Sequence, residues 1–249
     1  MKPYWTDGSV TLYLGDCREV LPALSVVADC VVADPPYGET SLAWDRWPDG
    51  WPDVAAKVTR SLWCFGSLRM FLGRRDEFAG WKLSQDVIWE KQNGTGFAAD
   101  RFRRVHEHVL HWYQGPWGGI HHEVPRLPNQ GRDRGNKSAE PKSANRFGHT
   151  GQLAVTAYVD DGLRLARSVI RARNLQRRAI HPSEKPAELL SLLIAYACPP
   201  GGLVIDLFAG SGSTLDAARQ AGRPAIGIEA DERSAEQAAR RLSQAVLTP

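Results

Sequence analysis

The sequence predicts an α/β protein with a doubly wound, mostly parallel sheet. The chain has 249 residues, 43% of them hydrophobic and 24% charged, which is close to globular averages and enough to bury a core. Short apolar runs alternate along it with longer segments of helical periodicity. Such alternation is typical of an open parallel sheet covered by helices on both faces, with ligands at the carboxyl ends of the strands.

In the first half of the chain, apolar or β-branched runs bounded by turn residues predict five strands. These are Val10–Leu14, Cys30–Ala33, Leu62–Phe65, Asp86–Trp89 and Val105–Tyr113. Apolar residues at helical spacing predict a short helix over Arg18–Val27, in which Pro22 is tolerated near the first turn.

The carboxyl-terminal part has the strongest helical pattern. It predicts helices over Ala187–Ala197, Thr214–Ala221 and Ser234–Val246. Apolar runs at Leu203–Ile205 and Ala225–Ile228 predict strands between them.

The middle of the chain differs in composition and charge. Gly115–Gly151 contains seven Gly and four Pro, so we expect a long loop there. Arg164–Arg178 contains six arginines among apolar residues, which predicts all or part of a basic amphipathic helix. Residues 101–180 hold 15 Lys or Arg against six Asp or Glu, whereas the whole chain has a net charge of only +3. This basic third favours a polyanionic partner, with a solvated helix face as the alternative.

Several classes of protein are disfavoured. The longest near-apolar run, Leu189–Cys198, is about half a membrane span. The first ten residues do not combine a basic end with an apolar stretch, so we expect the protein in the cytosol. Four cysteines without a CxxC pair indicate neither a disulfide framework nor a thiolate metal site.

The first motif with chemical meaning is Asp206-Leu-Phe-Ala-Gly-Ser-Gly-Ser-Thr214, which follows a strand and opens a helix. Gly210 and Gly212 let the backbone turn sharply and approach a ligand. Glu229 ends the next strand, where a carboxylate can accept two ribose hydroxyls. Leu215 replaces the third glycine of a dinucleotide fingerprint, and a GK[ST] sequence is lacking, which favours a nucleoside ligand without phosphates.

The second motif is Asp34-Pro-Pro-Tyr37, directly after a strand. The prolines restrict the backbone, so that the Asp34 side chain and the Pro35 carbonyl are paired acceptors beside the flat ring of Tyr37. This arrangement suits a flat substrate that carries an NH₂ group; a proline-rich turn with a capping Asp is the alternative. Three tryptophans come after this motif, and they either line such a pocket or pack against the sheet: Trp44, Trp47 and Trp51.

Together the two motifs resemble the amino-group DNA methyltransferases that use S-adenosylmethionine. Their order, with the tetrapeptide first and the Gly-rich loop last, is similar to the circularly permuted β class. Other segments in the same register are Gly15–Asp16, Trp89–Lys91, His106–Glu107 and His181–Pro186. The resemblance covers roughly residues 9–114 and 180–246 and implies a Rossmann-like methyltransferase fold.

The resemblance also implies roles for individual residues. Glu229 takes the cofactor ribose, Asp16 accepts from the cofactor adenine, and three residues lie near the methionine end, namely His181, Ser183 and Lys185. The catalytic residues are Asp34, Pro35, Pro36 and Tyr37. The full set implied for the cofactor S-adenosylmethionine is Asp16, Asp34, His181, Ser183, Lys185, Asp206, Phe208, Ala209, Gly210, Gly212, Ser213, Thr214 and Glu229.

The implied activity is methylation of the N6 amino group of adenine in a specific sequence of double-stranded DNA, after the base is flipped out of the duplex. Asp at the first position of the tetrapeptide is typical of adenine enzymes. The alternatives are cytosine-N4 methylation and a catalytically silent DNA-binding protein; RNA and protein-glutamine methyltransferases fit less well.

The expected organisation is a catalytic half over residues 1–114, a basic target-recognition insertion over residues 115–180, and a cofactor-binding half over residues 181–249. Double-stranded DNA is the expected partner, in the cytoplasm of a bacterial or phage-infected cell. A homodimer is left open and no metal is expected. The candidate DNA-binding residues are Arg171, Arg173, Arg177 and Arg178.

Overall fold

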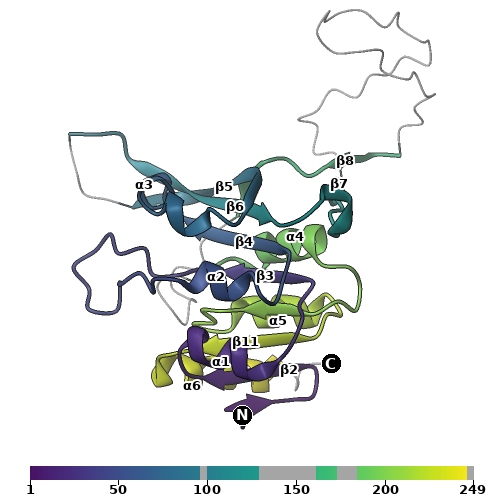
Figure 1. Ribbon diagram of the computed structural model, residues 1–249. Coiled ribbons are helices and arrows are strands. Elements are labelled where there is room, and N and C mark those ends of the chain that lie inside the picture. Colours follow the sequence, from purple (N-terminus) through teal and green to yellow (C-terminus); the bar gives the residue numbers. More distant parts are fainter. Residues whose placement is uncertain (96–99, 129–160, 173–183, 246–249) are drawn as a thin grey trace, which may run out of the picture. The chain divides into compact units, whose positions relative to one another are not determined.

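The computed structural model describes residues 1–95, 100–128, 161–172 and 184–245 (Figure 1). Contacts divide the chain into two compact units, residues 1–123 with 167–249 and residues 124–166. In the second unit, β7 (Arg126–Pro128) pairs antiparallel with β8 (Leu163–Leu165).

A nine-stranded sheet is the centre of the first unit within the described residues. From edge to edge its strands are β1 (Trp5–Thr6), β2 (Val10–Leu14), β11 (Ala225–Glu229), β10 (Val204–Asp206), β3 (Cys30–Ala33), β4 (Ser61–Gly66), β6 (Arg104–Tyr113), β5 (Lys82–Thr95) and β9 (Val169–Arg171). Only β1 and β6 run against their neighbours in this described sheet, so it is mixed but mostly parallel.

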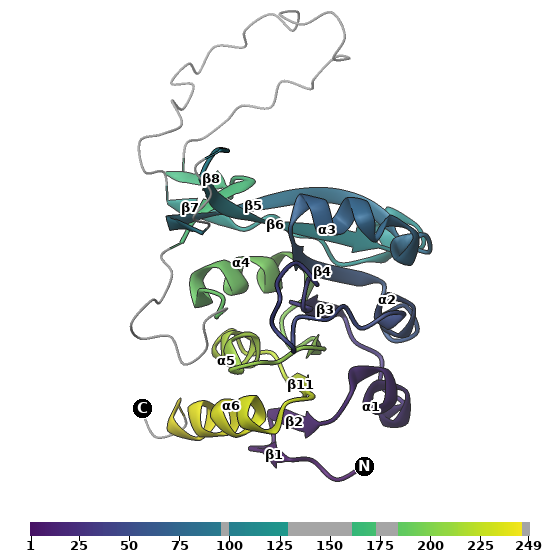
Figure 2. The same ribbon diagram turned by 90° about the vertical axis from the view of Figure 1, so that its left-hand side faces the viewer.

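Helices cover both faces of this sheet, as Figure 2 shows. One face packs against α4 (Ala187–Ala197), α5 (Ser213–Gln220) and α6 (Glu232–Ala245). The other packs against α1 (Cys17–Leu24), α2 (Trp51–Ala55), α3 (Leu68–Gly73) and the 3₁₀ turn η1 (Arg75–Phe78); a second 3₁₀ turn, η2 (Trp117–Gly119), follows β6.

The two faces explain why β3 is apolar throughout. Cys30 and Val32 are buried in the cluster with α4 to α6, whereas Val31 and Ala33 are buried in the cluster with α1 to α3. Successive side chains of a strand point to opposite faces, so a strand covered on both sides needs a continuous apolar run. The predicted α/β class and its doubly wound sheet are confirmed.

The prediction of a helix over Arg164–Arg178 is wrong for the described part of that segment. β8 and β9 lie there instead. Val169 and Ile170 join β9 to β5 through the pairs Ile88 with Val169 and Trp89 with Ile170. Pairing with a distant strand overrides the local helical spacing of the arginines. Residues 173–178 lie outside the described residues, as does most of the predicted loop Gly115–Gly151.

Four neighbouring parallel strands end at one edge of the sheet and carry acidic residues there. Asp16 follows β2, Glu229 ends β11, Asp206 ends β10 and Asp34 follows β3. This is the edge where open α/β sheets bind ligands. No helix in the described part of the chain is both long and apolar enough to cross a membrane.

Candidate active site

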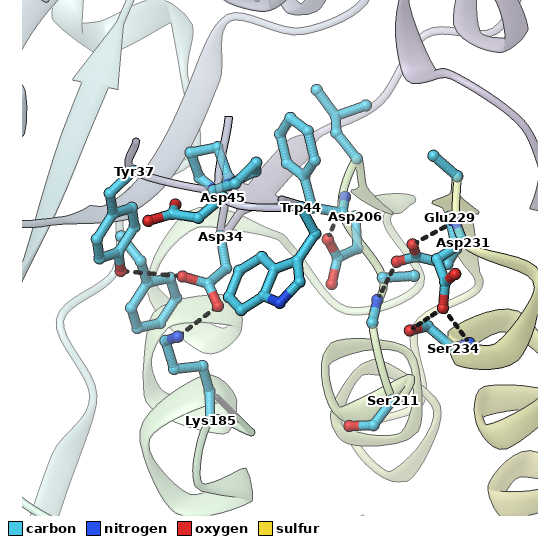
Figure 3. Close-up of a pocket in the computed structure, with 18 of the residues that line it drawn as sticks. Asp34, Tyr37, Trp44, Asp45, Lys185, Asp206, Ser211, Glu229, Asp231 and Ser234 are labelled. Carbon is cyan, nitrogen blue, oxygen red and sulfur yellow. Dashed lines mark hydrogen bonds and ion pairs between the residues drawn. The ribbon is translucent and has the colours of Figure 1, made fainter. Parts of the chain in front are cut away.

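A cavity of about 800 Å³ opens at this edge of the sheet (Figure 3). Its lining includes the tetrapeptide Asp34–Tyr37, the loop Asp206–Gly210 and Glu229. In the view of Figure 3, Tyr37, Asp34 and Lys185 lie to one side and Asp206 and Glu229 to the other. The fold therefore brings both sequence motifs to the same cavity.

The Gly-rich loop is shaped by backbone conformations that favour glycine. Gly212, which caps the amino end of α5, has φ of 77°, and Gly210 has φ of 49°. A Cβ atom on Gly212 would lie 3.1 Å from the Cβ of Ala238, so α6 also limits this position to a residue without a side chain. The loop is thus held against two helices while its backbone faces the cavity.

Glu229 joins the end of β11 to the loop. Its Oε2 accepts a hydrogen bond from Gly210 N at 2.7 Å and its Oε1 accepts one from Asp231 N at 2.8 Å. Burial raises the pKa of the Glu229 carboxyl, and these backbone hydrogen bonds oppose the rise. Each oxygen keeps a lone pair, so the oriented carboxylate can still accept from hydroxyl groups.

Asp206 is the most deeply buried of the acidic residues at this edge, with 4% of its surface exposed. Burial raises its pKa to about 7, although hydrogen bonds from Thr214 and from Phe208 N, the latter at 3.0 Å, act in the opposite direction. The carboxylates of Asp34 and Glu229 add to the rise. This group therefore gains or loses a proton near neutral pH.

Asp34 is held on both carboxylate oxygens. Tyr37 donates its hydroxyl to Oδ1 at 3.0 Å, and the ammonium of Lys185 donates to Oδ2. Burial raises the pKa of Asp34, Lys185 lowers it, and Glu107 raises it further. The predicted acceptor is thus fixed in place by two donors.

The segment after the tetrapeptide forms one wall of the cavity. The buried Asp45 carboxylate accepts hydrogen bonds from the backbone N–H groups of Gly38, Glu39 and Thr40 at 2.7 to 3.0 Å. The neighbouring Trp44 is 61% exposed, and its indole lines the cavity. By contrast, Trp47 and Trp51 are buried in the core. Of the three tryptophans, only Trp44 is placed to contact a ligand.

Asp16 caps the amino end of α1 through a hydrogen bond from Arg18 N at 2.8 Å. The Arg18 guanidinium also binds both oxygens of this carboxylate and donates to Asp49 O. Hydrogen bonds from Arg18 are the main cause that lowers the pKa of Asp16. Asp16 lines the cavity as an ionised acceptor, so the adenine contact implied for it is compatible with its surroundings.

Most predicted site residues meet at the cavity. Those that line it are Asp16, Asp34, Pro35, Pro36, Tyr37, Lys185, Asp206, Phe208, Ala209, Gly210, Ser213, Thr214 and Glu229. Gly212 shapes the loop from behind. His181, Ser183, Arg173, Arg177 and Arg178 lie outside the described residues, so their roles stay predictions. Arg171 is on β9, where its guanidinium pairs with Glu90.

Sequence reasoning gave no role to two charged residues that the sheet brings to the cavity. Lys91 on β5 and Glu107 on β6 form an ion pair with both side chains largely buried. The available signal was their place in the segments Trp89–Lys91 and His106–Glu107, which are in register with the family. Their meeting depends on the antiparallel register of β5 and β6, which pairs Trp89 with Glu107.

Another ion pair joins Glu184 to Arg241, which also donates to Ser211 and so links the segment before α4 to the Gly-rich loop. The cysteines Cys17, Cys30, Cys64 and Cys198 are free and buried. Within the described residues, no group of three or more His, Cys, Asp or Glu is arranged to hold a metal ion.

Comparison with known proteins gives a consistent result. A family described as DNA methylase, covering N6 and N4 methyltransferases, matches residues 28–240. The type II methyltransferase M.HinfI of Haemophilus influenzae is 24% identical over 281 residues, covering 100% of this chain and 72% of the relative.

Two solved structures share the fold. The M1.HpyAVI–SAM complex has a TM-score of 0.62 at 19% identity and covers 93% of this chain and 99% of that one. The cytosine-N4-specific PvuII DNA methyltransferase has a TM-score of 0.65 at 18% identity and covers 96% and 88%.

Proposed function

Because the chain belongs to the DNA methylase family of N6 and N4 methyltransferases, we propose that it transfers a methyl group from S-adenosylmethionine to the N6 amino group of adenine in a specific sequence of double-stranded DNA. One observation carries the proposal. A single cavity is lined by the acceptor tetrapeptide Asp34–Tyr37 and by the loop Asp206–Gly210 with Glu229.

The residues of the loop suit S-adenosylmethionine. Glu229 offers oriented carboxylate oxygens for a ribose, Phe208 offers an apolar side chain, and Gly210 leaves the backbone open. The structural neighbour M1.HpyAVI, described as a SAM complex, supports the same ligand. S-adenosylmethionine supplies a methyl group on a positively charged sulfur.

Asp34 and Pro35 act on the target amine. An exocyclic base amine is a poor nucleophile because its lone pair is delocalised into the ring. When the Asp34 carboxylate and the Pro35 carbonyl accept its two N–H groups, they favour a localised lone pair that attacks the methyl carbon directly, without a covalent bond to the protein. The N–C bond forms as the S–C bond breaks, S-adenosylhomocysteine leaves, and the methylated nitrogen gives up one proton. Tyr37 holds Asp34 through its hydroxyl while its ring is available to a flipped base. Flipping costs a few kcal/mol, and stacking of about 1 to 3 kcal/mol offsets part of it.

Adenine is favoured by the Asp at the first position of the tetrapeptide. Cytosine-N4 methylation is the second candidate, because the chain is also similar in fold to the cytosine-N4-specific PvuII enzyme. The type II relative M.HinfI is bacterial, which supports a restriction–modification role in the cytoplasm. Basic residues of the segment 115–180 are proposed to contact the DNA.

One experiment separates these candidates. The purified protein is incubated with S-adenosylmethionine and unmethylated genomic DNA, which is then digested to nucleosides and analysed by mass spectrometry. We expect N6-methyladenine from the natural protein and none from Asp34→Ala. N4-methylcytosine would establish the second candidate, and no methylated base would favour the catalytically silent protein.

A further inference from the structure

Four charged side chains, one of them the proposed acceptor Asp34, are linked by ion pairs. Lys91 on β5 pairs with Glu107 on β6, and Lys185, just before α4, pairs with Asp34 after β3. The side chains are largely buried, and that of Lys185 is only 6% exposed. Two ammonium groups and two carboxylates balance, so the cluster as a whole is neutral.

Glu107 has one carboxylate oxygen with a hydrogen bond and one without. Its Oε1 is bound by Lys91, whereas its Oε2 is buried and accepts no hydrogen bond. The Nζ of Lys185 lies 3.7 Å from this Oε2, which is an ion-pair distance but too long for an N–H···O hydrogen bond. A buried acceptor without a donor is unfavourable, so a small movement of the Lys185 ammonium toward Glu107 is favoured because it gives Oε2 a hydrogen bond.

Asp34, in contrast, has a donor on each carboxylate oxygen, and one of the two donors is a cation. Lys185 occupies Oδ2 and Tyr37 occupies Oδ1. A carboxylate that already binds an ammonium is a weaker acceptor for a neutral amine, because the positive charge withdraws electron density from it.

We propose that Lys185 is a positioning residue with two positions. In the free protein it donates a hydrogen bond to Asp34, and when the target amine binds Asp34 it donates to Glu107 Oε2 instead. The inference rests on the proposed function. One N–H···O bond breaks and one forms at Lys185, while the amine supplies a new donor to Asp34, and no proton changes owner. Lys91 keeps Glu107 in place as the second acceptor, and the ring of Phe65, 5.0 Å from Nζ, borders the path.

The surroundings of the cluster favour the charged forms of Glu107 and Lys185. Burial alone would raise the pKa of Glu107, but Lys185 and Lys91 outweigh it and lower the pKa. Burial alone would lower the pKa of Lys185, but Asp34 and Glu107 raise it. Among the described residues, the titratable groups that face Asp34 are Lys185, Glu107, Tyr37, Asp206 and Cys64, and burial keeps the Cys64 thiol protonated by raising its pKa.

The first test is Glu107→Gln, which keeps the shape but removes the charge that receives Lys185. We expect the single-turnover rate of methyl transfer to unmethylated genomic DNA to fall about tenfold or more at its high-pH plateau, with cofactor affinity within twofold of the natural protein. Asp7→Asn, which breaks the ion pair with Arg219 outside the cavity, is the matched control and should leave the rate unchanged. A Glu107→Gln rate within twofold of the natural protein would overturn the proposal.

The second test begins from a different variant, Lys185→Met. Lys185→Met removes the ammonium that lowers the pKa of Asp34, so the acid limb of the pH–rate profile should move to higher pH. Adding Glu107→Gln to Lys185→Met removes a negative charge that raises the pKa of Asp34, so the acid limb should move partly back to lower pH. The same substitution thus harms the protein with Lys185 and helps the one without it, a reversal that a purely structural role does not produce.

An acid limb that stays in place in Lys185→Met would contradict the proposal. The activity of the natural protein distinguishes a wrong proposed function from a wrong role of Lys185. If it methylates no DNA, the proposed function is wrong; if it methylates DNA and the Glu107→Gln and Lys185→Met profiles match it, the two-position role alone is wrong.

Discussion

At the scale of single residues, the carboxylates at one edge of the sheet differ in proton affinity because their surroundings differ. Burial raises the pKa values of Asp34, Asp206 and Glu229. Asp45 is also buried, but its hydrogen bonds with Thr40, Gly38 and Glu39 outweigh that effect and lower its pKa. The edge therefore holds groups that are costly to ionise beside one that stays ionised and organises its loop.

Asp206→Asn tests the cost of the buried carboxylate. Its pKa is about 7 in the folded chain against an ordinary value of 3.8, so the folded state binds more protons between these values, and the stability it contributes falls as the pH rises through that window. The variant should therefore be more stable than the natural protein at pH 8, by on the order of a few kcal/mol, and not at pH 4. Denaturant unfolding at both pH values measures this. The exposed Asp53→Asn on α2 is the control, and an equal effect of Asp206→Asn at both pH values would contradict the pKa.

Asp34→Ala tests the acceptor of the target amine. Methyl transfer should fall by more than about 10²-fold, because Asp34 contacts the reacting nitrogen, whereas cofactor binding should change little. The fold should tolerate the change, since Glu107 remains as a partner for Lys185. Single-turnover assays and calorimetry give the two quantities. Turnover within tenfold of the natural protein would show that Asp34 is not the acceptor.

At the scale of elements, the site depends on where neighbouring strands end. The carboxyl ends of β2, β11, β10 and β3 place Asp16, Glu229, Asp206 and Asp34 along one edge. β6 runs the other way, so its beginning reaches the same edge and brings Glu107 there. The direction of each strand decides which of its ends contributes to the site.

Glu229→Ala tests the end of β11. The variant loses the oriented carboxylate proposed for the ribose, so cofactor affinity should weaken by about 2 to 4 kcal/mol. Calorimetric titration with S-adenosylmethionine measures it. Glu236→Ala, which removes an exposed carboxylate from α6, is the matched control. Equal affinity of Glu229→Ala and the natural protein would place the nucleoside site elsewhere.

At the scale of the whole molecule, charge is unevenly distributed along the chain. Residues 101–180 are net positive and the rest of the chain is net negative, and the sheet edge carries acidic residues. Arg171 is exposed on β9, but Glu90 neutralises part of its charge there. A DNA phosphate that binds Arg171 must compete with this carboxylate.

Replacing Arg171, Arg173, Arg177 and Arg178 together with Ala tests the proposed DNA contact. The slope of log affinity against log salt should fall by about 0.9 for every phosphate that is no longer bound, so binding weakens for all sequences and its salt dependence becomes shallower. Discrimination among sequences should survive, because phosphate contacts carry little sequence information. Filter binding over a range of salt concentrations measures the slope.

The control for this experiment replaces Lys57 and Arg60 with Ala, two exposed basic residues outside the basic segment. They should leave the slope unchanged. If the quadruple variant also leaves it unchanged, the arginines form a solvated face or an interface between copies of the chain rather than a DNA contact.

Local sequence patterns were sufficient to predict most of the helices and strands and to find both motifs. β2, β3 and α4 begin and end where their apolar patterns predict, because burial on two faces demands a continuous apolar strand and burial on one demands helical spacing. The Asp34 tetrapeptide and the Asp206 loop are also readable without a structure, since Pro and Gly constrain their own backbone. Their order along the chain was enough to predict the family.

Only the tertiary structure decided which distant residues meet. The pairing of β9 with β5 made a strand of a segment whose arginine spacing favours a helix, because contact with a sheet edge outweighs local propensity. Lys185 meets Asp34 and Glu107 through the packing of separate elements, and the raised pKa of Asp206 arises from its burial at the end of β10. Such contacts depend on register and burial, which local sequence patterns do not encode.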